Sequence, residues 1–449
     1  MNRLRILVLA PGCNPESITI PLEGYCQAEA LARLHDVVLA TRPDSEAPVR
    51  RAHGPFRSVE IVPMPWLDRF QNWALRRIFK FNFRSQLLTA FVVPISLAFE
   101  WRAWRQFRRR LAAGEFDVVL RLLPLSTVCP SPFAFFLRKG PIPYVVGPLN
   151  GGLPWPPGFS QAQRQKQWVS PLRGFYRFLP FARSIRHAKA IIAGSSHTFS
   201  ELAAHRDKLF YVPENGLSEW AFGEGRREDA ESDQLKLIFV GALVPYKGCD
   251  LALKAAASLI RKRLASFTIV GDGPDRERLH QLAADLGIAT GVKFLGEVAH
   301  SEVLERLRLA DVFVYPSVHE FGGAVVVEAL AAGAVPVVAD FGGPGDNVHP
   351  GVGFAVPLTD ETDVIAQIER VLTSLSEDRS LVRGLRERGM SYAREAFSWD
   401  AKARKITGIL EWVAGRGPKP QLPSPKPLAR LGRLPAVPGV AAGQASACD

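Results

Sequence analysis

The chain has 449 residues, of which 47% are hydrophobic and 22% are charged, and its formal net charge is +12. The apolar and charged fractions are typical of a globular protein. The length exceeds what one ordinary core holds, so we expect two domains. The positive charge favours anionic partners, namely nucleotide phosphates, acidic lipids or nucleic acid, without choosing among them.

The cysteines and the N-terminus bear on the cellular compartment. The five cysteines are scattered, and their spacing matches neither a zinc site nor a disulfide framework, so we expect a reducing cytosol. The N-terminal apolar run, ILVLAPG, is too short for a signal peptide and predicts a strand instead. The longest apolar stretch, at 87–99, is too short to span a bilayer. We therefore predict a cytoplasmic protein, with a peripheral position at the inner face of the cytoplasmic membrane as an alternative.

Short apolar runs alternate with helical patterns in the first half of the chain. Residues 5–11 predict a first strand, and residues 24–34 predict a helix. Further strands are predicted at 35–42, 117–123, 143–147 and 188–195. This alternation is typical of a doubly wound parallel sheet.

A change in sequence composition near residue 212 indicates a domain boundary. Residues 213–234 hold a loop with proline and glycine and then a charged run, which predicts a linker. A second α/β run follows, with strands predicted at 236–243, 266–273, 293–298, 311–317, 335–340 and 353–357. We thus expect an N-terminal Rossmann-like domain over 1–212, a second over 235–395, a C-terminal helix over 396–415 and a disordered proline- and glycine-rich tail over 416–449.

The loops after the strands of the second half contain the residues that indicate a ligand. In an open α/β sheet, ligands bind beyond the carboxyl ends of the strands, and here these loops carry glycine. In the stretch HEFGGAVVVEALAAGAVPVV, Gly323 precedes a predicted helix whose N-terminus suits a phosphate. Lys247 offers a cation to the same phosphate. Glu328 can accept hydrogen bonds from ribose hydroxyls, and Glu320 lies nearer the other end of the ligand. This order fits a nucleotide diphosphate joined to a sugar.

Glu320 and Glu328 are separated by seven residues, and this spacing resembles the E-x7-E signature of the retaining glycosyltransferases of group 1, or family 4, which have the GT-B fold. The resemblance covers about residues 190–415, through FVGALVPYKGCDLALKA, IVGDGPDRERL, VKFLGEV, LADVFVYPS, EALAAGAVPVVA and AFSWDAKARKITGIL. It implies an α/β protein of GT-B architecture, with two Rossmann-like domains whose parallel sheets face each other across a cleft. The nucleotide sugar would bind the second domain and the acceptor the first.

The resemblance also implies roles for individual residues. Glu320 would contact the transferred sugar and Lys247 would neutralise the diphosphate, which makes these two the catalytic candidates. Glu328 would bind the ribose of the donor. The other donor-binding candidates are Gly322, Gly323, Ala324, Gly241, Gly271 and Arg276.

The chain departs from the family pattern at Ala242, where many members have an arginine that also contacts the diphosphate. Arg276 and Arg278, after the GDGPD turn, are candidate substitutes. A weaker donor site, or a member without catalysis, therefore stays open. Simpler alternatives are ordinary surface carboxylates at Glu320 and Glu328, and plain turns at GDG and FGGPGDNV.

The sequence defines the acceptor side less well. Glu16, in the loop after the first strand, and Asn150 and Gly151, in the loop after PYVV, are the acceptor-binding candidates. We find no match for the catalytic histidine of some family members, so the acceptor base is unassigned. No Asp-x-Asp motif follows a strand, and the family's scheme requires no metal. We therefore expect no metal site and no cofactor, with a UDP- or GDP-sugar as the donor substrate.

Residues 66–110 interleave aromatic and basic side chains. On a helix, one side would carry Trp101, Trp104, Phe107 and Leu111, and another would carry Arg102, Arg105 and Arg109. This pattern fits a helix that lies in a membrane interface near a lipid-linked acceptor. It also fits an amphipathic helix packed on the sheet with a solvated basic face. No RNA- or DNA-binding motif is present, so we expect no nucleic-acid partner.

These features predict a retaining glycosyltransferase that moves a sugar from a nucleotide diphosphate sugar to a glycan or lipid-linked acceptor. Bacterial cell-surface polysaccharide is the expected product, by family analogy alone. Three alternatives stay open. One is a nucleotide-sugar epimerase of the GT-B fold, and another is a nucleotide-sugar-binding protein without catalysis, which Ala242 favours. The third is a nucleic-acid-binding protein, argued from charge alone.

Overall fold

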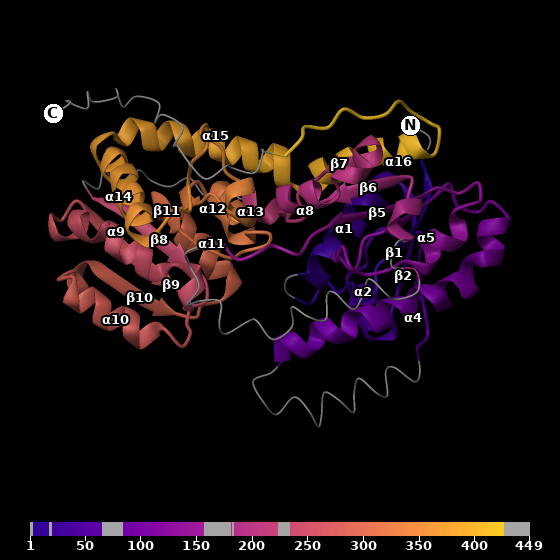
Figure 1. Ribbon diagram of the computed structural model, residues 1–449, viewed down its shortest axis with the longest axis horizontal. Coiled ribbons are helices and arrows are strands. Elements are labelled where there is room, and N and C mark those ends of the chain that lie inside the picture. Colours follow the sequence, from indigo (N-terminus) through magenta and orange to yellow (C-terminus); the bar gives the residue numbers. More distant parts are fainter. Residues whose placement is uncertain are drawn as a thin grey trace. The chain divides into compact units, whose positions relative to one another are not determined.

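The computed structural model describes residues 3–17, 20–64, 84–156, 181, 184–222 and 234–425. The described residues form two compact units (Figure 1). Most of the first unit precedes residue 219, and residues 396–425 complete it. The second unit consists of residues from 219–395 together with the short segment 154–156. The C-terminal part of the chain therefore returns to the unit in which the chain begins.

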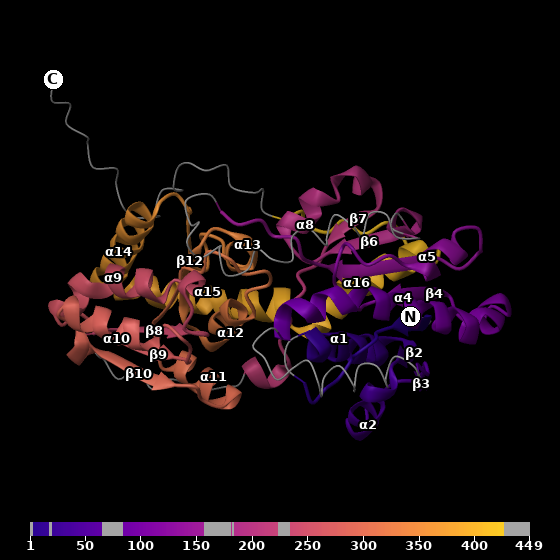
Figure 2. The same cartoon turned by 60° about the horizontal axis from the view of Figure 1, so that its bottom comes forward.

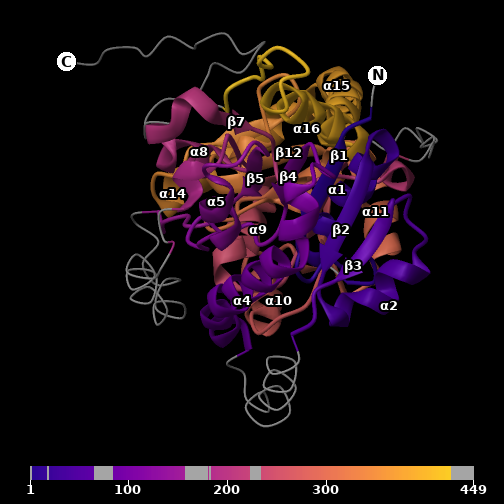
Figure 3. The ribbon, with the colours of Figure 1, turned by 90° about the vertical axis from the view of Figure 1, so that its right-hand side faces the viewer.

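The first unit is built on seven parallel strands in the order β3-β2-β1-β4-β5-β6-β7. Its central strands are buried apolar runs, because helices cover both faces, as all-parallel sheets require. Figure 3 shows β1, β2 and β3 side by side. The strands are β1 (Arg5–Leu9), β2 (Asp36–Thr41), β3 (Ser58–Ile61), β4 (Val118–Arg121), β5 (Tyr144–Leu149), β6 (Ala190–Ala193) and β7 (Leu209–Tyr211).

Two hydrophobic clusters cover the two faces of this sheet. One contains Ile6 of β1 and the helices α1 (Ile20–Leu34) and α16 (Trp399–Val413). The other contains Leu7 of β1 and the helices α4 (Arg84–Ala112) and α5 (Pro132–Leu137). Successive side chains of a strand point to opposite faces, so the clusters lie on opposite sides. The remaining helical segments of this unit are α2 (Pro43–Arg51), η3 (Ser184–His187), α8 (Ser196–Glu201) and η4 (Ala203–Lys208).

The second unit is built on six parallel strands in the order β10-β9-β8-β11-β12-β13. Figure 2 shows α9 (Cys249–Arg261) and α14 (Glu361–Glu377) packed side by side. The strands are β8 (Leu235–Val240), β9 (Ala265–Val270), β10 (Val292–Gly296), β11 (Val312–Tyr315), β12 (Val335–Ala339) and β13 (Phe354–Val356). The other helical segments are η5 (Glu219–Phe222), η6 (Pro245–Lys247), α10 (Arg276–Asp285), η7 (Ala289–Gly291), α11 (His300–Arg308), α12 (Ala324–Ala332), α13 (Gly342–Asp346) and α15 (Arg379–Phe397).

Both units are Rossmann-like α/β domains with parallel sheets, which confirms the predicted fold class. The strands β3 and β7 were not predicted from the sequence. Both are at the edges of their sheet. The four residues of β3 are only partly buried, and β7 has only three residues, so neither leaves a clear apolar pattern.

The C-terminal part of the chain packs on the first unit. The helix α16 contacts α1, and the passage from the first unit to the second lies between Ser218 and Glu219. The prediction of a disordered tail is wrong for residues 416–425. Arg416 pairs with Asp117 at 2.8 Å, and the Nζ of Lys419 lies 5.4 Å from the centre of the Trp412 ring. The rest of the predicted tail lies outside the described residues.

The helix α4 carries part of the basic and aromatic pattern, whereas residues 66–83 of that stretch lie outside the described residues. Phe107 is buried in the core of the first unit, and Trp104 stacks on Phe136 with ring centroids 5.0 Å apart. The apolar side of this part of the helix thus packs on the sheet, which is the second of the two interpretations given above. Trp101 differs, because it is 47% exposed.

Two properties bear on the predicted compartment. Among the described helices, none is both long enough and apolar enough to cross a membrane. Four cysteines lie in the described ranges, and all are free thiols: Cys13, Cys26, Cys129 and Cys249. Cys448 lies outside those ranges.

The buried His35 connects the end of α1 to α16 in the first unit. The backbone N–H of Leu4 donates to its Nδ1 at 3.3 Å, and its Nε2 lies 2.8 Å from the Thr407 hydroxyl. Because Nδ1 accepts, Nε2 carries the ring proton and donates to Thr407. Burial, followed by the charge of Arg3, lowers the pKa of His35 from 6.5 to about 4. The folded protein therefore holds a neutral imidazole over a pH range in which the unfolded chain is protonated.

We predict that the free energy of unfolding falls as the pH is lowered from 6.5 towards 4, and that His35→Gln weakens this dependence. The sign follows because the unfolded state binds more protons than the folded state in this window. Urea unfolding at a series of pH values measures it. The control variant is His280→Gln, which replaces an exposed histidine. An unchanged slope in His35→Gln would contradict the assignment of a neutral buried ring.

Candidate active site

The sheet of the second unit has a switch point between β8 and β11. From there the strand order runs outward to β9 and β10 on one side and to β12 and β13 on the other. Ligands of open α/β sheets bind at such a point, beyond the carboxyl ends of the strands. The loops that follow the two strands contain the catalytic candidates Lys247 and Glu320.

Lys247 and Glu320 form an ion pair at this edge of the sheet. The Nζ of Lys247 also donates to the Tyr315 hydroxyl at 2.7 Å, and that hydroxyl donates to Glu320 Oε2 at 3.0 Å. The side chains of Lys247 and Glu320 are 16% and 24% exposed, so solvent screens their charges only in part. The structure thus brings the two catalytic candidates together. It adds Tyr315, for which the only signal in the sequence was its place at the end of a buried strand.

The loop that carries Glu320 ends at Gly323, where α12 begins. Gly323 has a φ of 67°, a left-handed conformation that favours glycine. The next loop supports it, because the Gly343 N–H donates to the Glu320 carbonyl at 3.1 Å and Asn347 Nδ2 donates to the Gly322 carbonyl at 2.8 Å. The Val326 N–H donates to the Gly323 carbonyl at 3.0 Å. The two N–H groups before it precede the first helical hydrogen bond of α12 and, with the helix dipole, can bind an anion. The stretch FGGPGDNV therefore has a structural role as a support.

Glu328 lies further along α12, on its partly buried side. Its side chain is 14% exposed, and its Oε1 lies 3.7 Å from Nε2 of His300. Burial raises the pKa of Glu328, and His300 opposes this rise. The His300 ring packs edge-on against Trp220, with centroids 5.8 Å apart. A carboxylate shielded from water is a strong acceptor for sugar hydroxyls, and His300 and Trp220 are neighbours that the sequence did not reveal.

Gly241 and Gly271, both predicted to contact the donor, lie where the loops after β8 and β9 meet. A Cβ atom on Gly271 would lie 2.0 Å from the carbonyl oxygen of Gly241. One on Gly273 would lie 2.4 Å from the carbonyl oxygen of Leu243. These backbone contacts require glycine whether or not a ligand is present. Contact between these glycines and a donor stays a prediction.

Many family members have an arginine at the position that Ala242 occupies here. Two arginines after the GDG turn are candidates to take its role. Arg276 pairs with Asp272 at 2.8 Å, and its side chain is 42% exposed. Arg278 pairs with two carboxylates, at 2.7 Å and 3.4 Å. Since Arg276 pairs with one carboxylate and Arg278 pairs with two, Arg276 is the better placed of the two to reach a phosphate.

Known proteins share this arrangement of motifs. Residues 224–388 match the family model described as glycosyl transferases group 1. Residues 224–388 are thus a region of the group 1 glycosyltransferase type. The family predicted from the sequence is thereby confirmed, and its E-x7-E signature is the pair Glu320 and Glu328 described above.

Similar curated proteins match the chain over part of their length. A D-inositol 3-phosphate glycosyltransferase of Geodermatophilus obscurus is 35% identical over 237 residues, which are 48% of this chain and 51% of that protein. A GDP-mannose-dependent monoacylated alpha-(1-6)-phosphatidylinositol monomannoside mannosyltransferase of Corynebacterium glutamicum is 28% identical over 227 residues, which are 49% of this chain and 57% of that protein. The chain thus spans about half the length of these curated relatives.

A solved structure shares the fold over most of the chain. Alr3699/HepE of Anabaena, in complex with UDP, has a TM-score of 0.58 and 17% sequence identity, and the match covers 91% of this chain and 100% of that one. At this identity the likeness shows the fold alone. It is the GT-B fold, built from two Rossmann-like domains with parallel sheets.

The acceptor candidates lie in the first unit. Glu16 forms an exposed ion pair with Arg51 at 2.8 Å, and this contact lowers the pKa of Glu16. Asn150 is buried, and its Oδ1 accepts hydrogen bonds from the Gly151 N–H and the Ser195 hydroxyl, both at 2.8 Å. These bonds shape the loop after β5. Within the described residues Glu16 and Asn150 share no hydrogen bond, and their role in acceptor binding stays a prediction.

We predict that Gly323→Ala destabilises the protein more than Gly287→Ala does. The two glycines have φ values of 67° and 69°, so each substitution incurs the cost of a left-handed alanine, about 1–2 kcal/mol. A Cβ at 287 meets nothing within 4 Å, whereas one at 323 would lie 2.9 Å from the Pro344 nitrogen. Urea unfolding of both variants measures the difference. Equal losses would show that the loops after β11 and β12 do not pack as described.

Proposed function

We propose that this group 1 glycosyltransferase is a retaining enzyme that transfers a sugar from a nucleotide diphosphate sugar to a glycan or lipid-linked acceptor. The observation that carries the proposal is the arrangement at the switch point of the second sheet. Lys247, Glu320 and Glu328 lie there with the N-terminus of α12. A cation and a helix dipole suit the diphosphate, and the two carboxylates suit hydroxyls of the sugar and of the ribose.

In the proposed reaction, the bond between the anomeric carbon and the diphosphate oxygen breaks while the acceptor oxygen bonds to that carbon from the same face. The nucleoside diphosphate leaves with the bonding electron pair and takes up the acceptor proton. Lys247 and the dipole of α12 stabilise the negative charge that grows on the leaving group, and they are held in place before the reaction begins. Glu320 holds the sugar, on which positive charge develops. This scheme requires no metal ion.

We propose a UDP- or GDP-sugar as the donor, with no further cofactor. Two observations on similar proteins support this choice. The Anabaena protein was solved with UDP, and the Corynebacterium relative is named GDP-mannose-dependent. We propose synthesis of bacterial cell-surface polysaccharide as the role of the enzyme, by analogy with its family.

A second candidate function is nucleotide-sugar binding without transfer, or epimerisation of the nucleotide sugar on the same fold. Ala242 favours it, because the diphosphate would lack the arginine that many family members provide. Mass spectrometry of the donor after incubation with the enzyme and a glycan acceptor separates the candidates. Transfer releases the nucleoside diphosphate and adds a sugar to the acceptor, epimerisation changes only the donor's sugar, and simple binding leaves the donor intact.

We predict that one class of nucleotide sugar raises the melting temperature of the wild type and that Glu328→Ala removes most of this shift. A ligand that binds only the folded protein stabilises it by about 2.7 kcal/mol at a hundred times its Kd. A thermal-shift panel of UDP-, GDP- and ADP-sugars measures the effect and identifies the base. Glu377→Ala is the matched control, since this exposed carboxylate ends α14 of the same unit. No shift with any donor at saturating concentration would overturn the proposed donor site.

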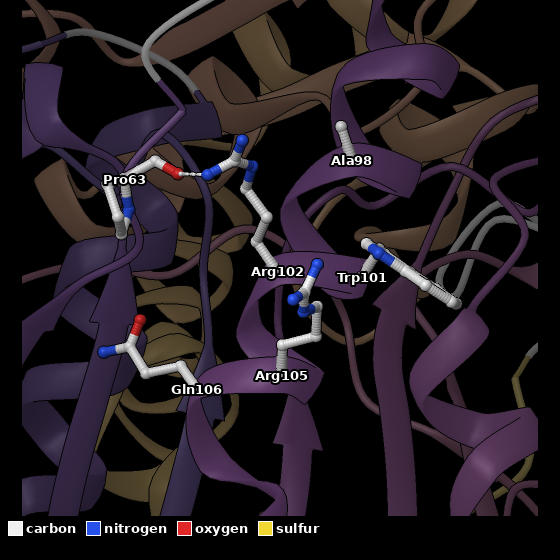
Figure 4. Close-up of a pocket in the computed structure, with 6 residues that line it drawn as sticks. All are labelled: Pro63, Ala98, Trp101, Arg102, Arg105 and Gln106. Atoms are coloured by element: carbon white, nitrogen blue, oxygen red, sulfur yellow. Dashed lines mark hydrogen bonds between the residues drawn. The ribbon is translucent and has the colours of Figure 1, made fainter.

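We also propose that the exposed side of α4 contacts an anionic membrane surface at the inner face of the cytoplasmic membrane, where a lipid-linked acceptor would lie. Figure 4 shows the residues around a surface hollow of about 570 Å³ beside this helix. Arg102 donates to the Pro63 carbonyl at 3.0 Å, and Trp101 and Arg105 also line the hollow. An exposed tryptophan beside arginines suits the boundary between lipid headgroups and acyl chains.

We predict that the protein binds vesicles that contain anionic phosphatidylglycerol better than neutral phosphatidylcholine vesicles. The double variant Arg105→Glu/Arg109→Glu should lose at least about tenfold in affinity, because each basic residue near such a surface contributes about 1 kcal/mol. Arg370→Glu/Arg383→Glu, which changes two exposed arginines of the second unit, is the control with the same change in net charge. Co-sedimentation measures both. If the two double variants lose the same affinity for the vesicles, net charge alone explains the binding. That result would contradict a membrane-binding surface on α4.

A further inference from the structure

An aromatic cluster beside the ion pair of the switch point has no role in the reaction described above. The rings of Trp155 and His319 are stacked, with centroids 4.1 Å apart and an interplanar angle of 15°. Tyr246 meets Trp155 edge-on at 6.1 Å, and Phe321 meets His319 edge-on at 5.3 Å. All four residues belong to the second unit, so the cluster is part of the donor domain itself.

The chain places these rings directly beside the charged residues. His319 immediately precedes Glu320, and Tyr246 immediately precedes Lys247. The Nζ of Lys247 lies 5.8 Å from the centre of the Tyr246 ring. The cluster therefore borders the end of the site at which Lys247 and Glu320 meet. In the proposed reaction this end holds the transferred sugar, whereas Glu328 marks the ribose end.

Trp155 differs from the aromatic residues of the core. Tyr315 is 1% exposed and His319 is 7% exposed, whereas Trp155 is only partly buried. The prolines on both sides of Trp155 restrict the backbone, so little backbone entropy is lost when this segment is held in place. A rigid indole with one face on His319 and part of its surface exposed is suited to contact a ligand.

A sugar that reacts in this way can bind to the face of an aromatic ring through two interactions. A sugar ring carries hydroxyls at its rim and C–H groups on its faces, and the C–H face packs on the apolar face of an indole. The face of an aromatic ring also carries negative partial charge, so it attracts the positive charge that develops on the sugar as the diphosphate leaves. Tryptophan is the side chain for which this attraction is strongest.

We propose that Trp155, stacked on His319, is the platform on which the transferred sugar of the donor lies. It contributes to binding of the hexose and not to binding of the nucleotide. The inference rests on the proposed donor site and deepens it, because it assigns recognition of the sugar to a residue outside the E-x7-E signature. Its consequence is that the loss of Trp155 affects a sugar nucleotide more than the bare nucleoside diphosphate.

The test compares the binding of each nucleoside diphosphate with the binding of a nucleotide sugar that contains it. Calorimetry measures binding of UDP, UDP-glucose, GDP and GDP-mannose to the wild type, Trp155→Ala and Trp155→Phe. For the nucleotide that binds, we expect Trp155→Ala to leave the Kd of the bare diphosphate within about twofold and to raise the Kd of the sugar nucleotide about fivefold to tenfold. Trp155→Phe keeps a ring and should lose less. Leu309→Ala, which truncates an exposed apolar side chain of the same unit, is the control. We expect it to leave the Kd of the bare diphosphate and the Kd of the sugar nucleotide unchanged.

Fluorescence provides a second measurement that does not depend on affinity. The chain has nine tryptophans, so the spectrum of the wild type minus that of Trp155→Phe isolates the signal of Trp155. We expect the sugar nucleotide, but not the bare diphosphate, to change this difference spectrum.

The outcomes separate the platform from the donor site. Equal weakening of both ligands, unchanged Kd values for both, or a difference spectrum that responds to both alike would overturn the platform and leave the donor site in place. If the wild type binds none of the four probes, the proposed function fails, and the platform fails with it.

Discussion

The geometry of the proposed donor site depends on loops that touch through their backbones. A Cβ atom on Gly248 would lie 2.4 Å from the carbonyl oxygen of Pro316, and one on Gly343 would lie 2.2 Å from the carbonyl carbon of Gly322. These contacts join the loops after β8, β11 and β12 into one layer. No side chain separates the loops, so they have little room to shift relative to one another. The preorganisation that a catalytic site needs therefore comes from glycine packing beneath the charged residues.

The parts of this site that follow a local pattern could be predicted from the sequence, and the parts that depend on distant contacts could not. The spacing of Glu320 and Glu328 and the alternation of strands with helices are short-range features. They predicted the two parallel sheets except for the edge strands β3 and β7, and they indicated a donor site that stays a prediction. Tyr315 contacts Lys247 only because β11 lies next to β8, and Trp155 meets residues from a distant part of the sequence. In α4, periodicity separated the apolar side from the basic side. It could not decide whether a sheet or a lipid surface covers the apolar side, because both are apolar partners.

The C-terminal part of the chain completes the first unit, although most of the second unit separates it in sequence from the rest of that unit. The Leu217 N–H donates to the Phe397 carbonyl at 2.8 Å, and the Trp399 N–H donates to the Leu217 carbonyl at 3.1 Å. The buried Lys402 donates to the carbonyl of Asn215 at 3.0 Å, and burial lowers the pKa of this lysine to about 7. The segment that leaves the first unit after Ser218 is thus hydrogen-bonded to the segment that returns to it at Ala396. The core of that unit is incomplete until α16 has been synthesised, so its full stability depends on residues that come after residues 219–395 of the second unit.

The pairing of Lys247 with Glu320 suggests how one site can bind the donor and then favour its transition state. Before the donor binds, each charge compensates the other where solvent is largely excluded, which limits the cost of burying them. In the proposed reaction the diphosphate takes the place of Glu320 at Lys247, and the sugar hydroxyls take the place of Lys247 at Glu320. As the bond to the anomeric carbon breaks, negative charge grows next to the lysine and positive charge grows next to the carboxylate. Both interactions strengthen on the way to the transition state, which is the differential binding that accelerates a reaction. A bare nucleoside diphosphate would satisfy only the lysine and leave Glu320 without its partner, so this arrangement favours the complete donor over the product.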